Sequence, residues 1–325
     1  MNSLIVALDK LAASQSRNEI LGVASFFRGL IYYHLVSRYG EVPILEAPFS
    51  GDIAASTEEE GWSFVEKNFQ VAIDYAPTFS DKYYVSKQAA KALMARTKLA
   101  QGKLTEAANL AEEVIGDANF SLADFDQIFR GKANREEIFS FVNLLNESSV
   151  NLSASLYSRA SANGGSYTYA PTTKVMNMFE PDDKRTAISI DMQETNEVIN
   201  KYPGGDVTTD PIIITRLGEM YLISAEAQGL SKGLSRLNEL RNFRGLPSVH
   251  PATEEDFIDA ILNERHTELL AEGFRWFDLV RLNRLESDLG FERKYNRLPI
   301  PAKERSLNKL LNLNTYWANL YDDND

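Results

Sequence analysis

The sequence indicates an all-α dominated protein made of packed helical hairpins, with a large irregular loop region that carries little β-structure. Two observations predict the hairpins: apolar residues recur at helical spacing in long stretches, and only a few residues connect one such stretch to the next. A third predicts the loop region, because the helical period is lost over residues 116–211. At 325 residues, the chain is long enough to bury a large core.

The first helix is predicted over residues 19–39. Apolar residues nearly encircle it, so we expect an interior helix. It must end near Gly40, because a glycine favours the left-handed conformation that closes a helix and Pro43 prevents the helix from continuing. A second helix is expected to start at Ser56 or Thr57, since three glutamates follow where the helix dipole favours acids.

A hairpin is predicted next, from helices over residues 86–101 and 105–115 with Gly102 between them. Its small residues recur where neighbouring helices must approach closely, which gives the pair the layout of a tetratricopeptide unit. The residues expected at this seam are Ala92, Ala95, Ala107 and Ala111.

The middle of the chain, residues 116–211, is polar, aromatic and rich in glycine pairs. Only residues 138–143 are predicted as a strand, and residues 172–179 as a short helix. Long ordered loops usually carry binding, so we expect the ligand site here. Helices are expected to resume over residues 213–229, 234–243, 254–272 and 274–285.

The composition argues against several classes of function. The net charge of −12 disfavours nucleic acid as a partner, since a phosphate backbone is bound by clustered lysine and arginine. The absence of cysteine excludes disulfides and thiolate metal sites, and the three histidines lack the paired spacing of a zinc site. No phosphate-binding glycine loop and no apolar run long enough for a membrane span occur, so neither a metal, a cofactor nor a spanning helix is expected.

Several blocks resemble one family. The stretch FFRGLIYYHLVSRYGEVPIL at residues 26–45 is followed in the right order by SKQAAKALMARTKLAQGK. Near the C-terminus come ITRLGEMYLISAEAQG, LNELRNFRGLP, AILNERHTELLAEGFRWFDLVRLNRL and LPIPAKE. Together these blocks resemble the SusD/RagB family of glycan-binding lipoproteins of Bacteroidetes outer membranes.

The resemblance implies a single SusD-like domain over residues 1–325 with an α/α superhelix. Helical repeats are expected at about 1–115 and 212–290, a variable ligand-binding loop region at about 116–211, and an extended C-terminal segment at 291–325. It also implies a cell-surface protein that captures a glycan or other nutrient and delivers it to a SusC-like TonB-dependent transporter, without catalysis. Such proteins are outer-membrane lipoproteins, and the signal and anchoring cysteine are not in this chain.

If that function applies, aromatic rings should pack on the C–H faces of sugars while polar groups bind their hydroxyls. The expected ligand-binding residues are Tyr157, Arg159, Asn163, Tyr167, Tyr169 and Tyr202. The alternative is that these rings only pack the loops onto the helices. A second aromatic group, around Tyr83 and Tyr84, is expected to be a structured loop between helices.

Two other functions stay open. The hairpins also suit an adaptor that binds only protein. A glycoside hydrolase needs two carboxylates across one cleft, and Glu180, Asp182 and Asp183 are available. The simpler interpretation of these acids is a solvated turn, with calcium binding by the acidic loop as an alternative, and no residue is assigned a catalytic role.

Overall fold

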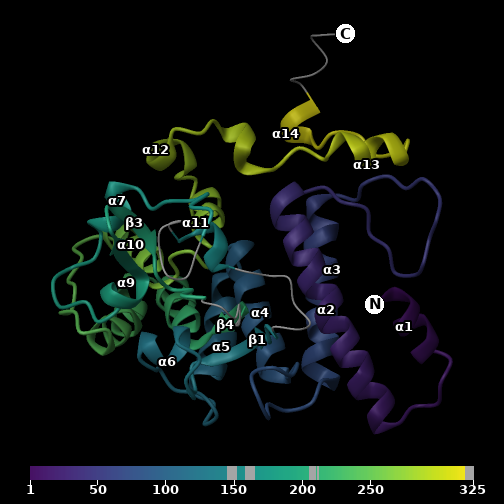
Figure 1. The fold of residues 1–325 in the computed structure, drawn as a ribbon. Coiled ribbons are helices and arrows are strands. Elements are labelled where there is room, and N and C mark those ends of the chain that lie inside the picture. Colours follow the sequence, from purple (N-terminus) through teal and green to yellow (C-terminus); the bar gives the residue numbers. More distant parts are fainter. Residues whose placement is uncertain (145–151, 158–164, 205–209, 211, 319–325) are drawn as a thin grey trace. The chain divides into compact units, whose positions relative to one another are not determined.

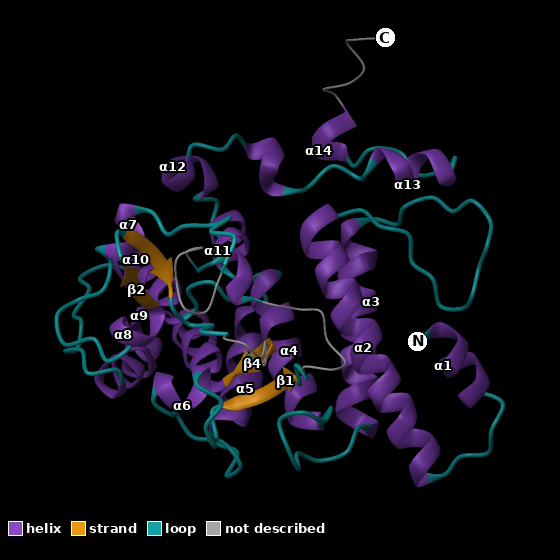
Figure 2. Ribbon diagram, in the orientation of Figure 1, coloured by secondary structure: helices purple, strands orange, loops and turns teal. Residues whose placement is uncertain are grey.

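The computed structural model describes residues 1–144, 152–157, 165–204, 210 and 212–318. Helices dominate this part of the chain, and the strands form only two-stranded sheets, which confirms the predicted all-α class (Figures 1 and 2). The chain divides into two compact units, each considered by itself below. The organisation as one SusD-like domain stays a prediction.

Unit 1 consists of Met1–Ser80, Val85–Gly102 and Trp276–Asp325. Its N-terminal helices are α1 (Asn2–Leu8), α2 (Gln15–Tyr39), α3 (Glu58–Tyr75) and α4 (Lys87–Ala100). Its C-terminal elements are α11 (Arg275–Arg281), α12 (Leu285–Leu289), the 3-10 helix η2 (Arg293–Asn296), α13 (Ala302–Leu307) and α14 (Thr315–Ala318).

Helices α2 and α3 form the centre of unit 1, and local signals set their ends as predicted. Gly40 follows α2 with a φ of 71°, and Thr57 caps α3 in a reciprocal capping box with Glu60. Close packing needs glycine: a Cβ at Gly22 of α2 would lie 2.3 Å from the backbone nitrogen of Ala76, just beyond α3. The two helices therefore approach nearly backbone to backbone.

The prediction of an interior first helix is correct for a broad face of α2 but not for its whole circumference. Ile20 and Ile31 of α2 are 45% and 52% exposed, so the helix buries one broad face and leaves apolar residues on another. Apolar residues on every side of a helix predict that every side is buried. Whether each side is buried depends on how many other elements pack around the helix, which its own sequence does not show.

Among the described residues, α2 alone is long and apolar enough to cross a membrane by length and composition. Its most apolar window is 61% buried within the protein, and its Arg28 donates to the Asn68 side chain of α3 at 2.6 Å. This is the packing of a core helix.

The C-terminal part of unit 1 was expected to be extended, but it contains the short helices α13 and α14. Polar side chains attach it to the N-terminal helices. Asn308 exchanges two hydrogen bonds with the backbone of Ile53, at 3.0 and 2.8 Å, and Asn314 donates to the Tyr39 carbonyl oxygen at 3.0 Å. The C-terminal segment therefore completes unit 1.

Unit 2 consists of Asp81–Tyr84 and Lys103–Arg275. Its helices are α5 (Leu104–Ile115), α6 (Phe125–Phe129), the 3-10 helix η1 (Ser153–Ser155), α7 (Thr173–Met176), α8 (Thr186–Ser189), α9 (Leu217–Phe243) and α10 (Glu254–Glu268). Its strands are β1 (Glu137–Phe141), β2 (Ile190–Gln193), β3 (Asn196–Ile199) and β4 (Ile212–Arg216). The pairs β1–β4 and β2–β3 are both antiparallel.

The predicted elements of unit 2 need three corrections. Residues 212–216 form strand β4 and not the start of a helix, because this short β-branched run pairs with β1. The loop region also holds α6, α8 and the β2–β3 hairpin, which were not expected. Helix α10 ends at Glu268, four residues early, and Ala271 and Gly273 follow with positive φ. The break near residue 229 is confirmed: Gly229 interrupts α9 with a φ of 68°.

The core of unit 2 contains a charge network, formed by Glu136, Arg185, Arg216, Arg244 and Glu268. Arg216 and Arg244 each bridge both glutamates, with N–O distances from 2.6 to 3.0 Å. Arg185 reaches the second oxygen of Glu268 at 2.8 Å. All five side chains are almost completely buried, so each charge depends on its partners.

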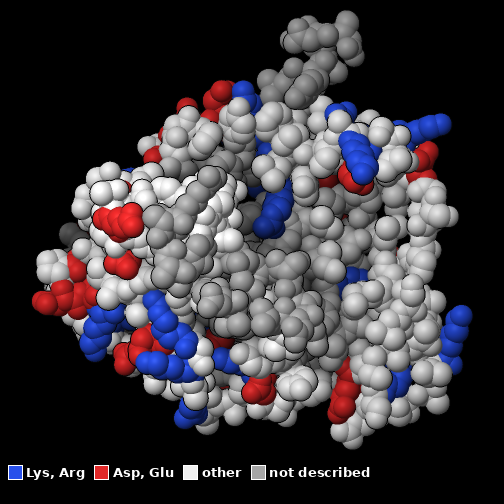
Figure 3. All heavy atoms as spheres, viewed as in Figure 1, with Lys and Arg blue, Asp and Glu red and all other residues white. Residues whose placement is uncertain are grey.

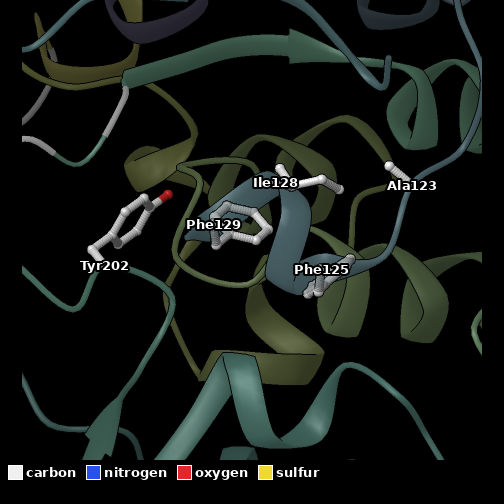
Figure 4. Packing of buried hydrophobic residues seen from close by; sticks show 5 residues of the cluster. All are labelled: Ala123, Phe125, Ile128, Phe129 and Tyr202. Atoms are coloured by element: carbon white, nitrogen blue, oxygen red, sulfur yellow. The ribbon is translucent and has the colours of Figure 1, made fainter. Parts of the chain in front are cut away.

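Figure 4 shows a cluster of buried aromatic and aliphatic side chains, and Phe125 of this cluster lies next to two arginines of the network. Phe129 contacts Phe125 and Tyr202 edge to face, with centroids 5.2 and 6.0 Å away. The guanidinium of Arg244 lies 4.8 Å from the Phe125 centroid, and the buried amine of Lys201 lies 4.7 Å from that of Phe129. The rings exclude water from the charges and strengthen their pairing.

Candidate functional site

The structure separates the predicted loop tyrosines into two kinds. Tyr157 and Tyr202 are only 2% and 6% exposed. The Tyr157 hydroxyl donates to Asn200 at 2.6 Å, and burial raises its pKa to about 12. Burial likewise raises the pKa of Tyr202 well above the usual value. Neither ring offers a face to a ligand in this structure, so both take the packing role left open by the sequence.

Tyr167 and Tyr169 lie on a loop that is firmly attached to unit 2. Three backbone N–H groups of residues 166–169 donate to carbonyl oxygens of residues 154–157, at 2.5 to 3.1 Å. The Tyr167 hydroxyl donates to the Glu197 carbonyl oxygen of β3 at 2.8 Å. Tyr167 has a φ of 49°, which is rare for a tyrosine and turns its ring onto the β2–β3 hairpin. This tyrosine therefore anchors the loop.

Tyr169 extends from the anchored loop and is 66% exposed. Ser166 and Thr168 precede Tyr169 on the same loop, both are exposed, and their hydroxyl oxygens lie 2.6 Å apart. We call Ser166, Thr168 and Tyr169 the loop patch. It combines a ring face for C–H groups with hydroxyls that donate and accept hydrogen bonds. The other predicted residues, Arg159 and Asn163, lie outside the described residues.

A polar pocket in unit 2 was not predicted. It has a volume of about 210 Å³, and its charged lining residues are Glu180, Asp183, Arg185, Arg241 and Glu264. Asn263, His266 and Thr267 of α10 add polar groups, and Met178 adds an apolar one.

The acids at residues 180–183 were interpreted as a solvated turn, and for Asp183 this was wrong. Asp183 is buried, and both of its oxygens accept from Arg185 at 2.8 Å. Arg185 also binds Glu264 at 2.6 Å. These partners lie 79 residues apart in the sequence, so no local pattern could have predicted the pairing. The short spacing of Asp183 and Arg185 was the one local signal.

Neither metal binding nor catalysis by the pocket acids has support in the described residues. Across the described parts of the chain, no group of three or more acidic, histidine or cysteine side chains is placed to hold a metal ion. The pocket carboxylates of Asp183, Glu180 and Glu264 all accept from arginines, which is the arrangement of structural ion pairs. On the face in view, Figure 3 shows acidic and basic side chains interspersed over the described residues.

The helix-dominated fold and the anchored, exposed loop patch are typical of helical proteins that carry a binding surface on their loops. The chain belongs to the SusD family, whose model matches residues 127–297, just over half of the chain. A second family model, described as "Starch-binding associating with outer membrane", matches residues 1–99.

Relatives and solved structures agree with this assignment. The chain is 26% identical to the SusD-like protein P2 of Formosa agariphila over 361 aligned positions, which cover 88% of this chain and 72% of that protein. A laminarin-binding SusD-like protein superposes with a TM-score of 0.83 at 23% identity, covering 96% of this chain and 82% of that one. The surface glycan-binding protein A of Bacteroides uniformis gives a TM-score of 0.81 at 21% identity, covering 97% and 82%. These two likenesses show the fold.

Proposed function

We propose that this protein binds a glycan at the outer surface of the outer membrane and delivers it, chemically unchanged, to a SusC-like TonB-dependent transporter. The observation that carries the proposal is the exposed ring of Tyr169 on an anchored loop, in a chain of the SusD family. The description of the second family model supports the location. The names of the laminarin-binding and surface glycan-binding neighbours support the kind of ligand.

The loop patch suits a sugar chain because its parts are fixed before binding. Tyr167 and the backbone hydrogen bonds hold the loop, so little conformational entropy remains to be lost when a ligand packs on Tyr169. A tyrosine also offers a large contact area with few rotatable bonds. We therefore place the ligand over Tyr169, with the Ser166 and Thr168 hydroxyls at the sugar's edge.

The test compares Tyr169→Ala with Tyr84→Ala. Tyr84 is 68% exposed and also lies in unit 2, so it controls for loss of an exposed tyrosine. Both variants and the unchanged protein are applied to a glycan array, and hits are measured by calorimetry. We expect Tyr169→Ala to bind about tenfold more weakly, roughly 1.4 kcal/mol, and Tyr84→Ala to bind as before.

Other outcomes have clear meanings. Equal loss in both variants would remove the loop patch as the site. No binding to any glycan by the unchanged protein would contradict the glycan proposal and favour the adaptor. Release of reducing sugar from a bound glycan would contradict delivery without chemical change and favour the hydrolase.

A further inference from the structure

Four aromatic rings follow one another in the C-terminal part of unit 1. Trp276 of α11 contacts Phe291, and Phe291 contacts Tyr295 of η2, with ring centroids 5.5 and 5.6 Å apart. Tyr295 in turn contacts Trp317 of α14 at 5.4 Å. We call these four residues the aromatic row. Among the described residues, no ring contact joins Trp276 to Tyr295 or Phe291 to Trp317, so the rings form an extended row and not a compact cluster.

The aromatic row is partly open to solvent. Phe291 is 42% exposed, and the other three rings are half-buried. By contrast, the core rings Phe26 and Phe69 of the same unit are 0% exposed. In an edge-to-face contact one ring presents its edge and the other its face, so three such contacts cover only part of the faces of four rings. The row therefore keeps ring surface that a ligand can reach.

The backbone beneath the row is fixed before any ligand arrives. The indole N–H of Trp317 donates to the Arg297 carbonyl oxygen at 2.7 Å. The next residue, Leu298, donates its N–H to the Arg38 carbonyl oxygen of α2, also at 2.7 Å, and accepts from the Asn314 side chain at 2.7 Å. The segment that carries the row is thus attached to a core helix, so little conformational entropy is lost when a ligand packs on its rings.

Exposed polar side chains flank the row. The amine of Lys294 lies 5.2 Å from the Tyr295 centroid and pairs with Glu292 at 3.2 Å. The Glu292 side chain is 69% exposed, and Arg293 between them is exposed as well. An exposed ion pair adds little stability, so both partners can exchange water for the hydroxyls of a ligand. The carboxylate accepts from a hydroxyl, and the amine donates to one.

We propose that the aromatic row binds a glycan chain along its length, as a contact separate from the loop patch. The proposal rests on the proposed glycan function and adds a site in unit 1 to the one in unit 2. Successive sugars place their C–H faces on successive rings, while hydroxyls at the sugar edges bind Glu292 and Lys294. An extended row suits a chain better than a single sugar, because each further ring contacts a further sugar.

Tryptophan fluorescence reports on the row directly. Two of the three tryptophans, Trp276 and Trp317, end the row, and the third, Trp62, is only 8% exposed. Unit 2, which carries the loop patch, contains no tryptophan. Acrylamide quenches the fluorescence of exposed tryptophans, so a glycan on the row should protect them. The full chain is titrated with the hexasaccharides of starch, laminarin, cellulose, xylan and mannan, and with every oligosaccharide that binds on the glycan array.

The variants change one ring at a time. Phe291→Ala removes a central ring of the row, and Phe291→Tyr keeps one there. Phe49→Ala is the matched control, because Phe49 is 58% exposed, lies in unit 1 and is not part of the row. Circular dichroism and urea unfolding first check that each variant keeps its fold.

We expect at least one oligosaccharide to protect the unchanged protein from acrylamide in a saturable way. Binding should be about tenfold weaker in Phe291→Ala and unchanged in Phe291→Tyr and Phe49→Ala. Equal protection in Phe291→Ala would overturn the aromatic row as a glycan site. So would an equal loss in Phe49→Ala.

The two proposals fail separately. Array binding without any protection of the tryptophans, or protection that Tyr169→Ala removes and Phe291→Ala does not, would overturn the aromatic row and keep the loop patch. Protection and array binding that Tyr169→Ala leaves intact and Phe291→Ala weakens would remove the loop patch and keep the row. Neither array binding nor protection would contradict the glycan function itself.

Discussion

His34 of α2 shows how one side chain can set the response of unit 1 to acid. Its ring lies beside Arg38, with its Nδ1 atom 2.8 Å from an arginine nitrogen. Burial, and then the positive charges of Arg38 and Arg96, lower its pKa to about 4 from the usual 6.5. Between these two values the unfolded chain binds a proton at His34 and the folded chain does not.

We therefore expect the free energy of unfolding of unit 1 to fall as the pH is lowered from 6.5 to 4. The contribution of His34 should be about 3 kcal/mol, and His34→Gln should remove this part of the pH dependence. His250→Gln, at an exposed residue of unit 2, should not.

Tryptophan fluorescence in urea is the appropriate measurement. All three tryptophans, Trp62, Trp276 and Trp317, lie in unit 1, so their signal reports its unfolding. Parallel pH curves for His34→Gln and the unchanged protein would contradict the role of His34.

The pairing of α2 with α3 depends on residues without side chains. A Cβ at Gly22 would come 2.3 Å from the backbone nitrogen of Ala76, and one at Gly61 would come 2.7 Å from Val36. Alanine normally stabilises a helix relative to glycine by up to about 1 kcal/mol. The clash at Gly22 is with backbone, so a Cβ there must push α2 away from the end of α3.

Gly22→Ala is therefore expected to destabilise unit 1 by about 1–3 kcal/mol, against the helix propensity. Ser16→Ala, at an exposed residue of the same helix, should change stability by less than about 0.5 kcal/mol. Urea unfolding followed by tryptophan fluorescence measures both. A Gly22→Ala variant as stable as the unchanged protein would show that the close approach is not required.

The charge network joins elements from the whole length of unit 2. Glu268 of α10 accepts from Arg185, Arg216 and Arg244, all buried. Burial alone would raise the pKa of Glu268, but these arginines lower it well below the usual value. Glu268 thus carries the negative charge on which three buried cations depend.

We expect Glu268→Gln to destabilise unit 2 by about 3–5 kcal/mol, because it leaves buried guanidiniums without compensation. Lys132→Gln, which removes an exposed ion pair with Asp126, should cost less than about 1 kcal/mol. Thermal and urea unfolding followed by circular dichroism compares them. Similar midpoints for the two variants would mean that the network contributes little net stability.

Features set by neighbouring residues could be predicted from the sequence, and features set by contacts between residues far apart in the chain could not. Thr57, Ser86 and Gly40 act within one helical turn, so the helix ends that they set were predicted to within a residue or two. Strand β4 was mistaken for helix because only its pairing with β1, about 75 residues away, distinguishes the two.

The same limit applies to the site. Aromatic composition identified the loop that carries Tyr169, but the burial of Tyr157 and Tyr202 depends on packing against partners such as Phe129 and Asn200. Apart from the short spacing of Asp183 and Arg185, the pocket had no local signal, because its wall joins Arg185 to Glu264 across 79 positions. The burial of the two tyrosines and the formation of the pocket both depend on contacts between segments far apart in the chain, which a short stretch of sequence does not reveal.

Unit 1 is discontinuous in the chain, and this affects how it can be synthesised. Residues 1–102 leave the ribosome before the 173 residues of 103–275, while residues 276–318 follow last. At about 5–20 residues per second, the early helices wait roughly 10 to 40 s for their last partners, since Asn314 is synthesised 212 residues after residue 102. Until then, the Tyr39 and Ile53 backbone groups that Asn314 and Asn308 later bind remain uncovered. A nascent chain therefore holds α2 and α3 half assembled, and any product that stops before residue 276 stays in that state.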